Sequence, residues 1–563
     1  MLFAVRTATA LHRLLDVLPA LSGDERLRPV FTLVPGSAFD AGALVAIERA
    51  GARSIPWDEA VEQPFDLIVA ASPNGRLHCL KGPLALLPHG AGFNKRAAGG
   101  GPDAATGLSR AQVLRADRPL AAFHGLAHPE QLARLATESA QAAARAAVVG
   151  DPTLDRLLES AAARARHRAA LGTGTRRLVV LTSTWGEQSL LARHPRLPHH
   201  LATHLPYDAF QVALVLHPNE HNAPDPFTLR TRLGPALDAG LILAEPYEEW
   251  GAVLVAADCV ISDHGSTALY AAALDRPVLA AHHTGHDSEL LPGSPMAALL
   301  AHAPRLRLGP DAPPCADQLT RALAAHRPGA VRELAAHAFA ERGRALDLLR
   351  HRLYGLLGLT PPPTPPEPRP LPLPAPGRPL TACTVGVTTA PDGDLHVERR
   401  PVTGPPGGHL AVEEGLAGTR LTQSAGLLLR RARAGTTGRT GGPETAPPET
   451  AAEWSARVLA AYPACRTAGA VLARDHCVLR LRDAPAGDAP HPTGLLSVRI
   501  TPPHPTPEAP GRYPDPAAVL SAVHTWLLRN PPGTGSRIRC VVADVPVLAE
   551  LAPATRQEAT TEL

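Results

Sequence analysis

Four short polar segments of the chain each follow an apolar run that is typical of a buried strand. They are Pro88–Gly90, Thr182–Gly186, His217–His221 and Asp263–Thr267. In open α/β sheets, ligands bind beyond the carboxyl ends of parallel strands, so side chains at these strand ends are candidates for one shared site. Hydroxyl and imidazole groups beside glycine-containing turns are groups that bind phosphate and move protons.

The first segment places His89 directly before Gly90, and Lys95 follows. A glycine-flanked turn lets backbone N–H groups approach an anion, and an imidazole there could act as a general base. The other interpretation is a histidine that bonds a backbone carbonyl in a tight turn. The chain has only two lysines, Lys81 and Lys95, and they flank this histidine. Because an ammonium is more compact than a guanidinium, we interpret the pair as marking a site that needs the smaller cation.

The fourth segment has the most specific pattern. Asp263 ends an apolar run, Gly265, Ser266 and Thr267 follow, and an apolar helix over 266–274 begins at once. Free N–H groups at a helix start, with two hydroxyls beside them, form a phosphate site, and the helix dipole also favours an anion there. The plainer alternative is an ordinary helix cap by Gly265 or Ser266.

The remaining two segments carry weaker patterns. Thr184 lies in a hydroxyl-rich turn that can cap a helix or donate to a phosphate. We interpret Trp185 first as a packing residue, and the alternative of a base-stacking platform stays open. His217 leaves its strand just before Pro218, which fixes the backbone there. The pair Glu220-His221 lacks the spacing of a zinc helix and a third ligand, so the sequence predicts no metal site.

Alternating strand-like and helical stretches predict two Rossmann-like domains with parallel sheets, residues 1–147 and 148–357. The expected strands of the first are Leu2–Val5, Val30–Val34, Asp66–Ala71 and Leu84–Leu87. Those of the second are Leu178–Leu181, Val212–Leu216, Leu241–Ala244, Cys259–Ser262 and Pro277–Ala281. Two such halves with a cleft between them form the simplest assembly, and the second half is expected to bind a nucleotide.

Residues 358–379 are rich in proline and predict an extended, semi-rigid linker. Beyond it, residues 380–563 predict a smaller α+β domain of unknown role. Its expected elements include a hairpin around Pro391–Asp394, helices Ala452–Ala461 and Pro516–Leu528, and several short strands. The tail after Ala552 is expected to fray.

Composition excludes several classes of function. The 55 basic and 52 acidic residues nearly balance, which gives no electrostatic footprint for nucleic acid or a membrane surface. The seven scattered cysteines form no Cys-x-x-Cys pair and favour a reducing compartment. The apolar run before Arg6 is too short for a signal peptide, and no uncharged run reaches transmembrane length. We therefore expect a cytoplasmic protein without a transmembrane segment.

These motifs together resemble the CDP-glycerol glycerophosphotransferases and related polyol-phosphate polymerases of teichoic acid synthesis, which have a GT-B fold. The resemblance covers about residues 1–355, and each motif is weak alone while their common order is fairly specific. In the first half, the family has a His-Gly-Thr turn with a following Lys, which corresponds to His89-Gly90-Ala91 with Lys95. In the second half, its Pro-Thr-Trp turn corresponds to Ser183-Thr184-Trp185 and its His-Pro turn to His217-Pro218. Its Asp-Tyr-Ser-Ser turn corresponds to Asp263-His264-Gly265-Ser266, and its Asp-Arg-Pro strand entry to Asp275-Arg276-Pro277. Two positions depart from the family pattern: Ala91 replaces its Thr, and Tyr270 its second acidic residue.

The resemblance implies a GT-B transferase that moves a glycerophosphate or glycosyl group from a nucleotide-activated donor to a hydroxyl acceptor, such as a cell-wall polymer or glycan. His89 and His217 would be catalytic, His89 as the base and His217 stabilising the donor's charge. The residues implied at the donor phosphate are Lys95, Thr184, Asp263, Gly265, Ser266 and Thr267. Metal ions and cofactors would not be needed, because the helix dipole and the histidines supply the electrostatics.

Two other functions stay open on the sequence. One is a non-catalytic nucleotide- or sugar-binding scaffold, which Ala91 and Tyr270 favour. The other is a GT-B isomerase of the nucleotide-sugar 2-epimerase kind. Since fold does not fix function, the donor, the acceptor, the oligomeric state and the role of 380–563 also stay open.

Overall fold

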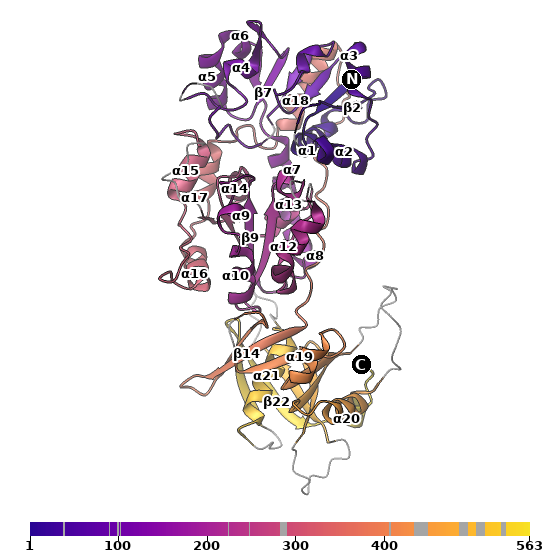
Figure 1. The fold of residues 1–563 in the computed structure, drawn as a ribbon, viewed down its shortest axis with the longest axis vertical. Helices are drawn as coiled ribbons and strands as arrows, with labels where there is room; N and C mark the ends of the chain where they lie inside the picture. The colour runs from indigo at the N-terminus through magenta and orange to yellow at the C-terminus, as the bar shows by residue number, and fades with distance from the viewer. Residues whose placement is uncertain are drawn as a thin grey trace.

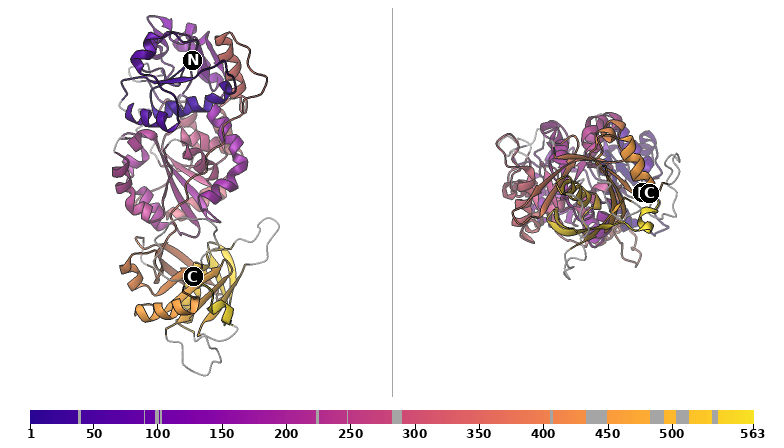
Figure 2. Two further views of the ribbon diagram at one scale, coloured as in Figure 1. Left: turned by 90° about the vertical axis from the view of Figure 1, so that its right-hand side faces the viewer. Right: turned by 90° about the horizontal axis from the view of Figure 1, so that it is seen from below.

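The computed structural model describes residues 1–37, 40–88, 90–97, 101, 103–222, 225–246, 248–281, 290–404, 407–432, 449–482, 494–502, 513–530 and 536–563. Three units are stacked along the long axis of the molecule, with the N-terminal unit at one end and a barrel at the other (Figure 1). The second view shows the same order of units (Figure 2).

The first unit contains a six-stranded parallel sheet in the order β2-β1-β3-β4-β7-β8. Its strands are β1 (Leu2–Val5), β2 (Val30–Leu33), β3 (Ile68–Ala70), β4 (Leu84–Leu86), β7 (Phe123–Leu126) and β8 (Ala146–Val148). Its helices are α1 (Ala8–Val17), α2 (Asp40–Arg49), α3 (Trp57–Glu62), α4 (Arg110–Val113), α5 (Pro129–Glu138) and α6 (Ala140–Ala143). Successive residues of β1 belong to different apolar clusters, because helices cover both faces of the sheet.

The second unit contains a five-stranded parallel sheet in the order β11-β10-β9-β12-β13. Its strands are β9 (Arg177–Ser183), β10 (Phe210–Leu216), β11 (Ile242–Leu243), β12 (Cys259–Ser262) and β13 (Val278–Ala280). Its helices before β13 are α7 (Pro152–Glu159), α8 (Arg164–Ala170), α9 (Leu190–Arg193), α10 (Leu197–His204), α11 (Pro218–Asn222), α12 (Pro226–Asp238), α13 (Glu249–Ala256) and α14 (Thr267–Ala273). Two Rossmann-like parallel-sheet units are therefore confirmed.

After β13 the chain forms α15 (Pro295–His302), α16 (Cys315–Ala325), α17 (Ala330–Ala336) and α18 (Ala345–Leu357). The last of these crosses back to the first unit, where Leu349, Leu353 and Tyr354 join the core that contains Phe3 and Leu11. Figure 1 shows α18 beside the N-terminal elements despite its late place in the chain. The first unit is thus completed by a helix that follows the second unit in the sequence.

The proline-rich segment 360–378 has no helix or strand, as expected, and its backbone forms hydrogen bonds with residues of both units. Arg350 of α18 donates to the carbonyls of Pro362 and Thr364. Further along, the Ala375 amide donates to Glu249 at 3.0 Å. The segment is therefore a strap across the two units rather than a free spacer.

The C-terminal unit is a closed nine-stranded barrel, so the expectation of a small α+β domain is not met as stated. In barrel order its strands are β14 (Ala382–Thr389), β15 (Leu395–Pro401), β21 (Arg537–Val542), β22 (Val545–Pro553), β20 (Leu496–Thr501), β19 (His476–Leu481), β18 (Thr467–Ala473), β17 (Leu427–Arg431) and β16 (His409–Glu413). The hairpin β14–β15 is confirmed, but closure needs the parallel pair β15–β21 between strands that lie far apart in sequence.

Helix α21 (Pro516–Leu527) packs inside this barrel, and its apolar residues share one core with the inward side chains of the strands. The other helices of the unit are α19 (Thr419–Ser424), α20 (Ala451–Ala461) and α22 (Arg556–Ala559). The expectation of a frayed tail is wrong, because Thr555 caps α22 and Leu563 is buried. Arg399 of β15 joins the barrel to the second unit through Asp208 at 2.5 Å.

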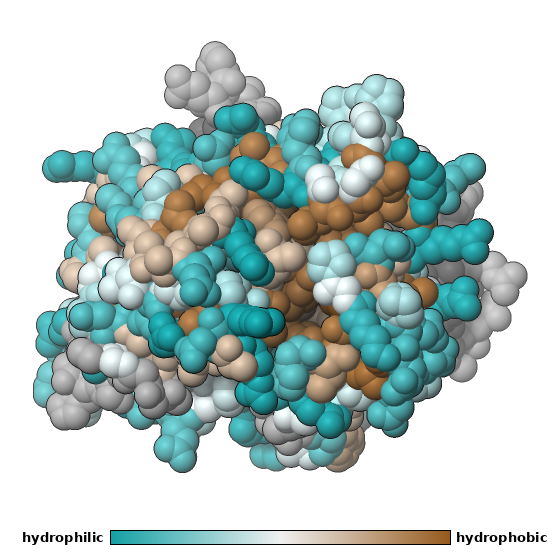
Figure 3. All heavy atoms as spheres, turned by 90° about the horizontal axis from the view of Figure 1, so that it is seen from above, coloured by the Kyte–Doolittle hydropathy of each residue, from teal (hydrophilic) through white to brown (hydrophobic). Residues whose placement is uncertain are grey.

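Three further findings concern membrane-spanning helices, the cysteines and one face of the surface. Over the residues that the structure describes, no helix is long and apolar enough to cross a membrane. All seven cysteines are free thiols. On the face seen from above the first unit, hydrophilic side chains alternate with smaller apolar areas (Figure 3), as on most protein surfaces.

Candidate functional site

A cleft of about 370 Å³ lies between the first and second units. Residues from all four strand-end segments line it, among them Gly90, Thr184, His217 and Ser266. His89 lies outside the described residues, but its two neighbours Pro88 and Gly90 are part of the lining. The structure therefore brings together the candidate residues that it describes, and it does so at the carboxyl ends of both sheets.

Asp263 organises the turn that the sequence placed at the donor phosphate. One of its oxygens accepts the amides of Thr184 and Leu190, each at 2.8 Å, and the other accepts the Gly265 amide at 2.9 Å. The side chain is buried, with 1% exposure of the residue. Since both oxygens are used within the protein, we infer that Asp263 positions the turn rather than binding a phosphate itself.

Burial raises the pKa of Asp263 to about 6 from its usual 3.8, although its three N–H bonds and nearby Lys95 act the other way. Between about pH 4 and pH 6 the folded protein keeps a proton that the unfolded chain has released. The contribution of the Asp263 carboxyl to the free energy of unfolding is therefore largest below about pH 4, and it is lost as the pH rises through about 6.

This shift predicts a pH-dependent difference between the parent and an Asp263→Asn variant, which cannot ionise. The parent-minus-variant difference in free energy of unfolding should fall by up to about 3 kcal/mol as the pH rises from about 4 to 6. Denaturant unfolding of both proteins across this range measures the difference. A difference that stays constant with pH would show that Asp263 does not titrate in this window.

Two glycines allow the turns to approach each other closely. A Cβ placed on Gly265 would lie 3.1 Å from Asp263 Oδ1 and 3.5 Å from Thr184 Cβ. A Cβ placed on Gly90 would lie 3.4 Å from Ser266 Oγ. Gly90 is therefore within contact distance of the Ser266 turn, across the boundary between the two units.

His217 continues from β10 and its amide donates to the Ser183 carbonyl at 3.0 Å. Its Nδ1 accepts the Asn219 amide at 3.2 Å. In the neutral imidazole this contact leaves the proton on Nε2, so the ring can donate a hydrogen bond from that atom. The neutral ring therefore has Nε2 as its donor atom, and His217 is part of the cleft lining.

Lys95 and Lys81 have different surroundings. Lys95 lines the cleft, and it is close enough to Asp263 to lower the pKa of that carboxyl. Lys81 lies away from the cleft, 3.7 Å from Glu62 with its side chain 56% exposed. The interpretation of the two lysines as a pair at one site is wrong for Lys81, whose ion pair is an ordinary surface contact.

Asn94 fixes the Lys95 loop against the second unit. Its side chain donates to the Ala91 carbonyl at 2.7 Å and accepts the Met296 amide at 3.2 Å. Its own carbonyl accepts the Leu291 amide at 2.8 Å. Ala91, which replaces the hydroxyl residue of the family pattern, is buried in the core of the second unit. Asn94 was not predicted from the sequence, since a single amide in a loop has no distinctive pattern.

Trp185 is an exposed residue of the cleft lining, so its interpretation as a packing residue is wrong. It is 45% exposed and its ring lies 6.3 Å from that of His217. Glu220, on α11, accepts the Gly186 amide at 3.1 Å and so holds the next residue of the turn. The neighbouring segment therefore supports the Trp185 turn.

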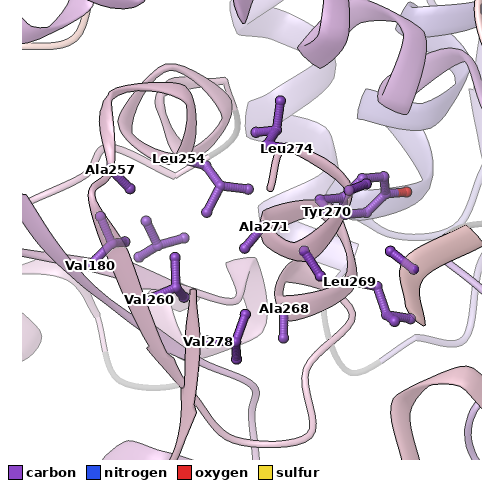
Figure 4. Packing of buried hydrophobic residues seen from close by; sticks show 14 of the residues in the cluster. Val180, Leu254, Ala257, Val260, Ala268, Leu269, Tyr270, Ala271, Leu274 and Val278 are labelled. Atoms are coloured by element: carbon purple, nitrogen blue, oxygen red, sulfur yellow. The ribbon is translucent and has the colours of Figure 1, made fainter. Parts of the chain in front are cut away.

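Helix α14 packs over β9, β12 and β13 with nearly all of its side chains (Figure 4). Its Tyr270 hydroxyl points away from this core and donates to Asp151 at 2.8 Å. Asp151 also accepts both terminal nitrogens of Arg13, at 2.6 and 2.9 Å, and caps α7 through the Leu154 amide. Tyr270 therefore fills a structural place at the junction of the two units, where the family pattern has an acid.

Helix α1 contributes a row of polar residues to the cleft that the sequence analysis missed. Thr9, His12, Arg13 and Asp16 all belong to the lining. Burial lowers the pKa of His12 to about 4, so this imidazole is neutral near pH 7. Polar residues at spacings of three and four on a helix of otherwise apolar residues could have revealed this row.

Arg156 joins both units and the strap at the floor of the cleft. It bonds Asp16 of α1 at 2.8 Å and Glu248 of the second unit at 3.2 Å. It also donates to the carbonyls of Arg369 and Pro370, at 2.9 and 3.0 Å. Arg369 in turn bonds Glu248 at 2.6 Å. The arrangement of the cleft therefore depends on the strap as well as on the two sheets.

Across the described ranges, no group of three or more acidic, histidine or cysteine side chains could hold a metal ion. The cleft instead offers a lysine, a histidine N–H, hydroxyl groups and backbone amides at the start of α14. This set can bind and stabilise an anion.

No protein-family model matches the sequence, and no curated protein is significantly similar to it. Among solved structures, the chain is similar to the UDP-GlcNAc 2-epimerase from Neisseria meningitidis bound to UDP-GlcNAc, with 12% identity, a TM-score of 0.41 and coverage of 63% of this chain and 99% of that one. It is also similar to the wall teichoic acid polymerase TagF, with 13% identity, a TM-score of 0.43 and coverage of 63% and 89%.

A third similar structure is S. aureus MnaA with UDP, at 11% identity, a TM-score of 0.39 and coverage of 65% of this chain and 99% of that one. Similarities at these identities and TM-scores decide nothing about activity. We therefore base the functional assignment on the geometry of the cleft.

Proposed function

We propose that the cleft binds a nucleotide-activated donor and transfers its glycerophosphate or glycosyl group to an acceptor hydroxyl, as in GT-B transferases. One observation carries this proposal: three strand ends and a loop of the opposite unit place Lys95, Thr184, His217 and Ser266 in one cleft. Together they supply a cation, an N–H donor and hydroxyls from separate elements. Such a fixed set suits the diphosphate of an activated donor.

In the proposed reaction the acceptor oxygen attacks the transferred group while His89 takes its proton. The bond from that group to the nucleotide's leaving phosphate oxygen breaks, and the oxygen keeps the electron pair. Lys95, His217 and the amides at the start of α14 stabilise the charge that develops there. Because these groups are held in place before the reaction, they favour the transition state without reorganisation.

Removal of two hydroxyls tests the phosphate site. A Ser266→Ala, Thr267→Ala double variant should bind the donor at least about tenfold more weakly, since hydrogen bonds to charged groups contribute about 1.5–3 kcal/mol each. Among the described residues, Ser266 makes no side-chain cap to α14, so the fold should be preserved. Calorimetry with the donors that the parent binds measures the change.

A Ser139→Ala variant serves as the matched control, because Ser139 caps α6 in the first unit and lies outside the cleft lining. Unchanged affinity of the double variant for every bound nucleotide would rule out this phosphate site. Donor binding without release of nucleotide would instead indicate a binding scaffold, and inversion at C2 of a bound nucleotide sugar would indicate an epimerase.

A further inference from the structure

Trp185 combines exposure with a place in the cleft lining. The residue is 45% exposed, whereas Trp454 is fully buried in the barrel unit, and the more exposed Phe227 lies outside the lining. Tryptophan offers a large rigid surface with little conformational freedom to lose, so an exposed one beside a cleft is well suited to contact a ligand.

The turn that carries Trp185 is fixed on both sides. The preceding amide, of Thr184, donates to buried Asp263 at 2.8 Å, and the following amide, of Gly186, donates to Glu220 at 3.1 Å. Gly186 has φ of +86°, a left-handed conformation that favours glycine. Since the backbone is already held, a ligand that contacts Trp185 need not order this turn.

The surroundings place Trp185 next to the proposed phosphate position. Thr184 lies against Gly265, where an added Cβ would come within 3.5 Å of its side chain. The His217 ring lies 6.3 Å from the indole, tilted by 41°. The other tryptophan of the cleft, Trp250, lies beside Tyr270, one turn further along α14, at 5.6 Å. Trp185 is thus the tryptophan adjacent to His217 and to the start of α14.

We propose that Trp185 is a stacking platform for a sugar ring, on the transferred group or the acceptor, next to the donor phosphate. The inference rests on the proposed function. It narrows the ligand beside the donor phosphate to one that contains a sugar ring rather than an open-chain polyol. A sugar ring presents a rigid face of C–H groups that can cover an indole in one contact. An open-chain polyol has no such face and must fix several rotatable bonds to lie flat.

Calorimetry with three ligand types tests this assignment: a nucleoside diphosphate, the same nucleotide linked to a hexose, and the same nucleotide linked to glycerol. The parent should bind the hexose-linked form about tenfold or more tightly than the nucleoside diphosphate, with a smaller gain for the glycerol-linked form. Trp185→Ala should remove the hexose gain and leave the nucleoside diphosphate affinity unchanged. Trp185→Phe should keep most of the gain.

A Phe227→Ala variant is the matched control, because Phe227 is 78% exposed and lies outside the cleft lining. The inference is overturned if Trp185→Ala keeps the hexose gain, or if it weakens all three ligands equally. In that second case the proposed function stands and Trp185 contacts the nucleotide.

If the parent binds no nucleotide, the proposed function fails separately. Trp185 is then tested by titrating free hexoses and oligosaccharides and recording tryptophan fluorescence. We expect a fluorescence change in the parent that the Trp185→Phe variant lacks. The absence of such a change overturns the inference too.

Discussion

A His89→Gln variant is expected to release nucleotide from the donor at least about a hundredfold more slowly than the parent, with donor affinity unchanged. Glutamine keeps hydrogen-bonding capacity but cannot take the acceptor's proton, and that transfer occurs only during the reaction. The neighbours of His89 support this expectation, since Pro88 and Gly90 line the cleft and Gly90 lies beside Ser266. A nucleotide-release assay with parent and variant side by side measures the rate.

His204→Gln is a suitable control, because His204 is exposed on α10, outside the cleft lining. It should release nucleotide at the parent rate. Equal release by the His89 variant and the parent would remove His89 from catalysis. No release by the parent with any donor that it binds would favour the binding scaffold over the transferase.

An Arg156→Met variant is expected to lose about 3 kcal/mol or more of unfolding free energy, because buried Asp16 then keeps only its longer ion pair, to Arg369 at 3.9 Å. Arg156 and Asp16 have side-chain exposures of 7% and 6%. The variant also loses the two bonds to the strap carbonyls, so cleft and strap should loosen together. Denaturant unfolding, followed separately for each transition, measures the loss.

Arg110→Met provides the contrast, since Arg110 and Asp117 are 61% and 85% exposed and such pairs contribute at most about 1 kcal/mol. Adding Asp16→Asn to the Arg156→Met variant should recover part of the loss, because it removes a buried charge that has lost its nearest cation. A loss no larger than that of Arg110→Met would show that Arg156 does not hold the two units together.

The paired Rossmann-like units could be predicted because parallel strands buried on both faces leave near-continuous apolar runs, as in Phe210–Leu216. The strand-end turns followed from the same pattern, since each polar segment begins where such a run stops. Residues that depend on contacts between distant elements could not be found in this way. Asn94 and Arg156 make such contacts across the two units, and no spacing in the sequence reveals them.

In the barrel, too, pairing between elements that are distant in sequence could not be predicted. The helices Ala451–Ala461 and Pro516–Leu527 were predicted almost as they occur. The closure of the strands around α21 was not, because it depends on the pairing of β15 with β21, about 140 residues apart by sequence number. Trp185 was misjudged for a related reason: sequence shows the residue type but not whether its ring is covered.

The most direct test of the central claim is the crystal structure of the protein soaked with a nucleoside diphosphate that it binds in solution. We expect the diphosphate to lie in the cleft at the start of α14, within hydrogen-bond distance of Ser266 and close to Lys95 and His217. Density for the nucleotide at any other place, with this turn unoccupied at saturating ligand, would contradict the assignment of the cleft as the donor site.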